Sequence, residues 1–267
     1  MNLSKLIKQY PVACFIAATL GLSFAAMLLP FPKDSAFAMI ASIMVLIPTL
    51  VAFALVTVMA GRKGLRAFLR EVFNGRVSLK WAVIAFVLGF ALHFGSSLLA
   101  LVTGLIAAIE ITTPTAFFIA VFPLALFEEI GWRGFALRRL LDRHSPFTAT
   151  VLIGVPWALL HFALFLGFAP GTSPVAEMLV VFTFALPLTW VYVRSGRNVL
   201  VATVLHGALN AFGIVAANIP PAELLWFVLA SACLIDAGLV LIDRRTWFTR
   251  PSETPIDAAL HQGQLLA

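Results

Sequence analysis

A series of long apolar segments along almost the whole chain is the feature that most constrains the fold. Eight segments are close to or above the length of about 20 residues that an α-helix needs to cross a bilayer. Their approximate bounds are 11–29, 36–60, 81–109, 114–137, 146–168, 174–194, 198–217 and 221–242. Of the 267 residues, 61% are hydrophobic and 11% are charged, whereas soluble domains are about half apolar and a quarter charged. The sequence therefore predicts an all-α, polytopic membrane bundle of about eight transmembrane helices.

The distribution of positive charge predicts how this bundle is oriented. With a cytoplasmic N-terminus, the inner loops contain 16 of the 18 Lys and Arg residues, all but Lys33 and Arg133 (18 − 2 = 16). An excess of Lys and Arg marks cytoplasmic loops, so we expect both termini to be cytoplasmic. We also expect a single transmembrane domain over 1–250 and a flexible polar tail over 251–267. This topology accounts for the net charge of +6, which therefore does not indicate nucleic-acid binding.

Two adjacent carboxylates and an arginine interrupt the fourth apolar segment. The run from 124 to 141 is mostly apolar, yet it contains Glu128, Glu129 and Arg133. An ionised side chain at the bilayer centre costs about 3 kcal/mol, so these residues need a specific role. Glu129 and Arg133 are four residues apart and can pair on one helix face, while Glu128 lies about 100° around the helix. The pattern predicts a structural ion pair beside a carboxyl group that is available for chemistry.

Polar residues also occur within two later segments. His161 lies in the fifth, and the seventh contains His206 and Asn210, which are four residues apart on one helix face. Facing lipid would be costly for each of them, so their faces should turn inward, where neighbouring helices converge. At about 1.5 Å of rise per residue, all lie within a few helical turns of Glu128 in depth. We therefore expect one intramembrane polar pocket that contains Glu128, His161, His206 and Asn210.

Side chains of these types can hydrolyse an amide by one of two mechanisms. A carboxylate or a neutral imidazole can act as general base on water, and an Asn amide or a second imidazole can donate to the developing oxyanion. Alternatively, Glu128, His161 and His206 would bind zinc, with water in the open fourth position. No serine or cysteine stands beside these histidines in a recognisable nucleophile motif, which disfavours covalent acyl transfer.

Three motifs occur in chain order on separate segments. Glu128-Glu129-Ile-Gly-Trp-Arg133 has the form EExxxR, and His206-Gly-Ala-Leu-Asn210 has the form HxxxN. Together they resemble the motifs of the CAAX protease and bacteriocin-processing (CPBP) intramembrane proteases, the family of the type II CAAX prenyl endopeptidase. Trp157-Ala-Leu-Leu-His161 stands where that family usually has FxxxH, a departure that keeps an aromatic side chain. The resemblance covers about 120–211 and implies a catalytic core over about 114–217.

The resemblance implies a role for each matched residue. Glu128 would be the catalytic glutamate, activating water together with His161. His206 and Asn210 would stabilise the oxyanion, with Asn210 as the favoured direct donor. Family members have been described both as metalloproteases and as metal-independent glutamate proteases, so zinc stays open as a cofactor.

We slightly favour a mechanism without an obligatory metal. If Glu128 were a metal ligand, the remaining candidate base would be Glu129, which is expected to be tied to Arg133. Glu129 and Arg133 are accordingly expected to support the site. His93 is expected to be a core or interfacial histidine, and Asp236 is left without a role.

The function predicted in this way is an intramembrane endopeptidase. Its substrate would be a membrane-embedded or membrane-associated protein or peptide, including lipidated, CAAX-like ones. A non-catalytic membrane immunity or scaffold protein of the same fold is the main alternative. A proton-coupled transporter is less favoured, because two internally similar halves would be expected and none is seen. Short loops and a composition rich in Ala, Leu and Arg favour the bacterial inner membrane.

Overall fold

The computed structural model describes residues 2–30, 32–73, 76–110, 123–168, 171, 173–212, 219 and 221–249. Within these residues the chain is helical and contains no strand, so the all-α fold is confirmed. The helices are α1 (Leu3–Gln9), α2 (Pro11–Met27), α3 (Lys33–Phe73), α4 (Leu79–Val102), η1 (Ile130–Leu137), α6 (Arg138–Leu140), α7 (Pro146–Phe168), α8 (Pro174–Arg194), α9 (Val199–Phe212), α10 (Pro221–Ile242) and α11 (Arg244–Phe248). Residues 123–129 are also helical and lead directly into η1.

The described helices include several that are long and apolar enough to cross a membrane. Five meet this condition alone, namely the main parts of α3, α4, α7, α8 and α10, and a sixth is obtained if α1 and α2, bent by 112°, count as one span. The chain is thus an integral membrane protein. Part of the expected fourth segment, 114–137, and the expected tail, 251–267, lie outside the described residues. The predicted total of eight spans and the cytoplasmic location of both termini therefore stay predictions.

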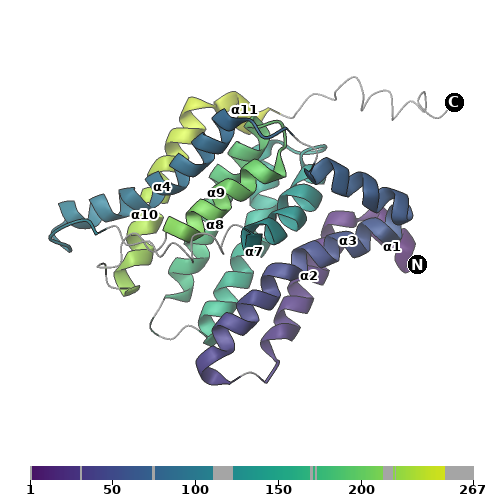
Figure 1. The fold of residues 1–267 in the computed structure, drawn as a ribbon, viewed down its shortest axis with the longest axis horizontal. Helices are drawn as coiled ribbons and strands as arrows, with labels where there is room; N and C mark the ends of the chain where they lie inside the picture. The colour runs from purple at the N-terminus through teal and green to yellow at the C-terminus, as the bar shows by residue number, and fades with distance from the viewer. Residues whose placement is uncertain are drawn as a thin grey trace.

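The helices form two groups on either side of α7 (Figure 1). On one side α2 packs against α3, and on the other α4 packs against α9 and α10, while α8 lies between α7 and α10. Small residues allow close approach of α4 and α9: a Cβ added to Gly89 would lie 2.6 Å from the Cβ of Ala208. Such contacts are typical of helix packing in membranes, where association depends on close packing rather than on the exclusion of water.

Helix α3 changes direction at Gly61. Gly61 has φ 61° and ψ −165° inside the helical stretch, a conformation that glycine adopts without the steric cost of a Cβ. The helix resumes after Gly61 and ends at Phe73. Arg138, at the end of η1, forms an ion pair with Glu71 of this second part.

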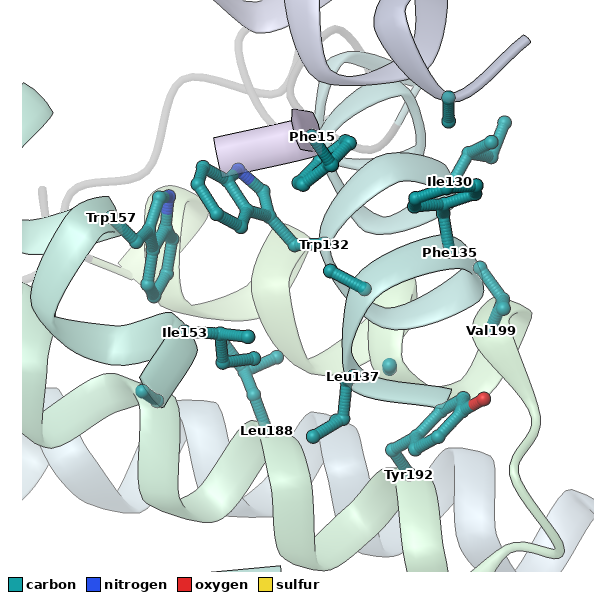
Figure 2. Packing of buried hydrophobic residues seen from close by; sticks show 14 of the residues in the cluster. Phe15, Ile130, Trp132, Phe135, Leu137, Ile153, Trp157, Leu188, Tyr192 and Val199 are labelled. Carbon is teal, nitrogen blue, oxygen red and sulfur yellow. The ribbon is translucent and has the colours of Figure 1, made fainter. Parts of the chain in front are cut away.

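A wide π-helical segment, η1, forms the centre of the core. The Arg138 N–H bonds to the carbonyl of Arg133, five residues earlier, as a π-helix requires. All eight residues of η1 are buried, and Figure 2 shows Trp132 and Phe135 packed beside Phe15 of α2. The rings of Phe15 and Trp132 meet edge to face, with centroids 5.2 Å apart. The two carboxylates that interrupt the apolar sequence therefore lie directly before a helical segment that is buried along its whole length.

Gly131 lets η1 lie directly against α3. A Cβ added to Gly131 would lie 2.5 Å from the Cβ of Pro48 and 2.6 Å from its backbone carbonyl. One residue further along α3, the Thr49 hydroxyl donates a hydrogen bond to the carbonyl of Phe127. These two contacts fix the helical turn that carries Glu128 against α3.

Candidate active site

The two adjacent glutamates lie in different environments. Glu129 is fully buried, and its Oε1 accepts hydrogen bonds from Arg133 Nη1 and from His206 Nδ1, both at 2.8 Å. The predicted ion pair between Glu129 and Arg133 is thus present. It forms a buried cluster with His206, which reaches it from α9. Both bonds go to Oε1, and Oε2 is buried without a hydrogen-bond partner among the described residues.

Glu128 faces away from this cluster, as the helical spacing predicts. It is half-buried, and its Oε2 accepts a hydrogen bond of 2.9 Å from the indole Nε1–H of Trp157 on α7. The bond joins residues that are 29 positions apart in the sequence. This hydrogen bond engages Oε2 of Glu128 and leaves Oε1 out of the contact with Trp157.

A small pocket of about 70 Å³ lies in front of Glu128. His161 lines it from α7 and Trp132 from η1, and the rest of the wall is apolar. Residues of α3 and α7 form that apolar wall: Ala41, Met44, Val45, Pro48, Leu160 and Leu164. We call this cavity the Glu128 pocket. A carboxylate and an imidazole on one wall of an otherwise apolar cavity are the arrangement expected of a small-molecule or peptide site.

The hydrogen bonds of the two histidines assign their protons. His161 Nδ1 lies 3.0 Å from the backbone carbonyl of Trp157, and because a carbonyl only accepts, Nδ1 must carry hydrogen. Nε2 of neutral His161 is therefore the nitrogen with a lone pair, which is the form that a general base needs. In His206 the Nδ1–H donates to Glu129, so Nε2 of that ring is an acceptor when neutral and a donor when protonated.

Trp157 is in contact with every charged or titratable group described so far except Glu129. Its ring centroid lies 5.5 Å from those of His161 and of His206, edge to face in each case, and 4.6 Å from the guanidinium carbon of Arg133. A guanidinium at this distance from an indole face is attracted to it. The indole, which is 4% exposed, therefore joins the buried cluster of Glu129 to the Glu128 pocket.

The structure distributes the predicted site residues over two neighbouring places. Glu128 and His161 line the pocket, whereas His206 lies behind Trp157 in the buried cluster. Asn210 is one turn further along α9 and is exposed. The sequence predicts one pocket that contains all four residues. In the structure Glu128 and His161 line the Glu128 pocket, whereas His206 does not line it and contacts Trp157.

Two features of the site have no signal that sequence reasoning could use. The sequence motif indicates Trp157 only as an aromatic residue in place of the usual Phe, although its N–H is the group that bonds to Glu128. The contribution of α3 to the pocket wall, with Met44 and Pro48, comes from apolar residues that resemble any others in a membrane helix. Only the packing of α3 on η1 identifies them.

Zinc does not fit the residues as they are placed. In the part of the chain that the structure describes, which includes Glu128, His161 and His206, no three His, Cys, Asp or Glu side chains are close enough together to hold a metal ion. The Nδ1 of His206 is bonded to Glu129, and His206 does not line the Glu128 pocket. No step of the chemistry below is therefore assigned to a metal.

Two other buried polar residues lie in the bundle. His93 Nε2–H donates to the carbonyl of Leu209 at 2.7 Å, which ties α4 to α9 and agrees with its expected place in the core. Asp236 of α10 is 7% exposed, and its Oδ1 is without a partner among the described residues. Neither residue lines the Glu128 pocket.

Comparison with known proteins identifies relatives of the central region. A family model described as type II CAAX prenyl endopeptidase Rce1-like matches residues 110–212, which include Glu128, His161, His206 and Asn210. The protein "CAAX prenyl protease 2" of Methanococcus maripaludis is 27% identical over 135 residues, which are 47% of this chain and 49% of the relative. The chain thus spans about half the length of the curated relative that it matches. Through the motifs of this region, residues 110–212 are similar to the CAAX proteases, and the comparisons support a place for the chain among the CAAX protease and bacteriocin-processing proteins.

Proposed function

We propose that the protein is an intramembrane endopeptidase that hydrolyses a peptide bond of a membrane-associated substrate. The observation that carries this proposal is the pairing of Glu128 with His161 on the wall of one apolar pocket, while the neighbouring Glu129 is occupied by Arg133 and His206. Two bases facing one cavity have no evident structural role there. The name of the relative from Methanococcus maripaludis supports proteolysis as the chemistry.

In the proposed reaction Glu128 acts as general base on water. The carboxylate takes a proton as the water oxygen attacks the substrate carbonyl, and Nε2 of His161 accepts the second water hydrogen bond. The resulting tetrahedral oxyanion collapses when the C–N bond breaks. The proton held by Glu128 then passes to the leaving nitrogen, so the products are a carboxylic acid and an amine, and both bases return to their initial states.

Oxyanion stabilisation is assigned to residues of α9. The Asn210 amide is always a donor, whereas His206, with Nδ1–H bonded to Glu129, donates through Nε2 only as the imidazolium. Because Asn210 is exposed in the structure, the proposal requires bound substrate to lie across α9 as well as in the pocket. Glu129 and Arg133 would position His206.

The substrate class follows from the apolar wall and from the relatives. The wall formed by α3 and α7 fits a hydrophobic side chain or lipid better than a polar peptide, and the relative is named for prenylated CAAX substrates. We therefore infer a lipidated, CAAX-like peptide as substrate. The short loops and composition of the chain support a location in the bacterial inner membrane.

The test is cleavage of membrane-anchored reporter peptides, prenylated and unprenylated, by the full chain in liposomes. Glu128→Gln should abolish cleavage, and His206→Ala and Asn210→Ala should each reduce it by about 100-fold, as expected for loss of an oxyanion donor or of its support. Glu223→Gln, a change at an exposed glutamate in the first turn of α10, is the matched control and should retain full activity.

Chelation distinguishes the two mechanistic classes. Activity that survives a chelator but is lost in Glu128→Gln would support the glutamate mechanism. Loss on chelation with recovery on adding zinc would contradict it. A correctly folded wild-type protein that cleaves none of the reporters would favour the scaffold or immunity role instead.

A further inference from the structure

A second pocket lies outside the candidate active site, beside the bend between α1 and α2. It has a volume of about 600 Å³ and is lined by the end of α1, the first turn of α2, α6 and the connection that follows α6. Its charged or titratable wall residues are Lys8, Arg139, Asp142, Arg143 and His144. We call it the basic pocket. None of its lining residues belongs to the Glu128 pocket, so a separate role must account for it.

The positive charge of this pocket is not neutralised by its own acid. Asp142 is the one carboxylate on its wall, and Arg197 donates to Asp142 Oδ1 at 3.0 Å. Lys8 and Arg143 therefore line the cavity while its carboxylate is bound to another arginine. The guanidinium of Arg139, also on the wall, donates to the carbonyl of Phe135 at 2.8 Å. Burial and the charge of Arg138 lower the pKa of Arg139 to about 10, although Asp142 and Tyr192 act in the opposite direction.

The hydrogen-bond donors of the pocket match an oxyanion with several acceptor oxygens. Arg143 and Lys8 are exposed and offer N–H groups. The Tyr10 hydroxyl accepts a bond of 2.9 Å from Gln9 Nε2, so its own hydrogen is available to donate. Arginine binds phosphate in a bidentate manner and lysine as a point charge. A phosphate group uses all of these donors, whereas a carboxylate has only two oxygens to offer.

The position of α1 places the pocket at the level of lipid headgroups. The chain bends by 112° between α1 and α2, so α1 runs close to the membrane surface if α2 crosses the bilayer. Leu3 of α1 is 69% exposed and Tyr10 at the bend is 50% exposed. An apolar residue and a tyrosine at such a position are typical of a helix lying in the membrane interface.

We propose that the basic pocket binds the phosphate group of an anionic membrane phospholipid, with the acyl chains alongside α2. The site is independent of the proposed peptidase activity. A soluble phosphate compound would offer the same anionic group. The headgroup depth of the pocket and the exposed apolar residues beside it favour the lipid.

The experiment measures lipid retention by the full chain in detergent, using native mass spectrometry. The probes are dioleoylphosphatidylglycerol and dioleoylphosphatidylcholine, which share acyl chains and differ in net charge. Lys8→Gln/Arg143→Gln removes two exposed charges from the pocket, and Arg244→Gln/Arg245→Gln removes two exposed charges from α11 as the matched control. A thermal melt of each variant verifies that it is folded.

We expect the wild type and the α11 variant to retain phosphatidylglycerol in preference to phosphatidylcholine. The pocket variant should bind phosphatidylglycerol about 10- to 30-fold more weakly, from the loss of two cations near an anionic headgroup. Equal losses in both variants would overturn the site in favour of diffuse surface charge, and unchanged binding in the pocket variant would overturn it outright. If inorganic phosphate at matched ionic strength displaced the lipid with equal affinity, the pocket would belong to a soluble anion and the lipid assignment would be wrong.

Discussion

Replacing Trp157 with phenylalanine removes one hydrogen bond and retains a ring in the same place. In the wild type the indole N–H donates to Glu128 Oε2 at 2.9 Å and so holds the proposed base in one orientation. A hydrogen bond to a charged group contributes about 1.5–3 kcal/mol. If that amount were fully expressed in the transition state, the rate would fall about 10- to 150-fold. We expect a decrease in kcat of about 10- to 30-fold, because the phenyl ring preserves most of the packing around Glu128.

The assay is steady-state cleavage of the best reporter peptide in liposomes, with kcat and KM determined separately. Trp157 itself lines the pocket, but the rest of its apolar wall is unchanged. Loss of base positioning should therefore lower kcat and leave KM within about twofold. Trp190→Phe is the matched control. Its indole also donates to a carboxylate, Asp243 Oδ2, at 2.9 Å, but outside the Glu128 pocket, so this change should leave kcat unaltered.

Two results would refute this reasoning. A Trp157→Phe protein with wild-type kcat would show that the bond does not position the base, and a rise in KM alone would assign Trp157 to substrate binding. A readout without turnover tests the bond itself: the indole N–H resonance of ¹⁵N-labelled Trp157 should shift in Glu128→Ala. Absence of that shift in a folded protein would show that the hydrogen bond is not present.

Three further changes test the fold around the site. Glu129→Gln should lower the free energy of unfolding in detergent by about 3–5 kcal/mol, because it leaves the buried Arg133 without its counter-charge. Glu128→Gln should change that free energy by less than about 1 kcal/mol. Similar losses in both variants would contradict a structural role for Glu129 alone. Gly131→Ala should lower the melting temperature, because its Cβ would meet the backbone of Pro48, while Gly238→Ala has open space and should not. The pKa of Asp243 is lowered: burial raises it, but hydrogen bonds from Thr246 and Trp190 and the charge of Arg194 outweigh that effect. The stability that this carboxylate contributes is therefore present above the unfolded pKa of about 3.9 and is lost as pH falls through the lower folded pKa. The difference in melting temperature between wild type and Asp243→Asn should then disappear in acid. A difference that stays constant with pH would show that Asp243 makes no such contribution.

Local spacing and composition predicted a large part of this protein. Long apolar segments predict membrane helices because each backbone polar group must be satisfied within the segment, and the described helices agree. The four-residue interval from Glu129 to Arg133 sufficed to predict their ion pair, since residues at that spacing share a helix face. The order of the EExxxR and HxxxN motifs likewise sufficed to indicate the family that the comparisons support.

Tertiary packing decided which partners the site residues have. Trp157 reaches Glu128 across 29 positions of sequence, and His206 reaches Glu129 across 77. The sequence spacing predicts neither contact, because each contact depends on how whole helices are rotated and positioned against one another. The π-helical form of η1, with all eight of its residues buried, likewise had no signal in the sequence. By itself the sequence determined that two carboxylates lie together in the membrane; only the packing of α7 and α9 around them decided that Glu129 is bound in a buried cluster and Glu128 faces a pocket.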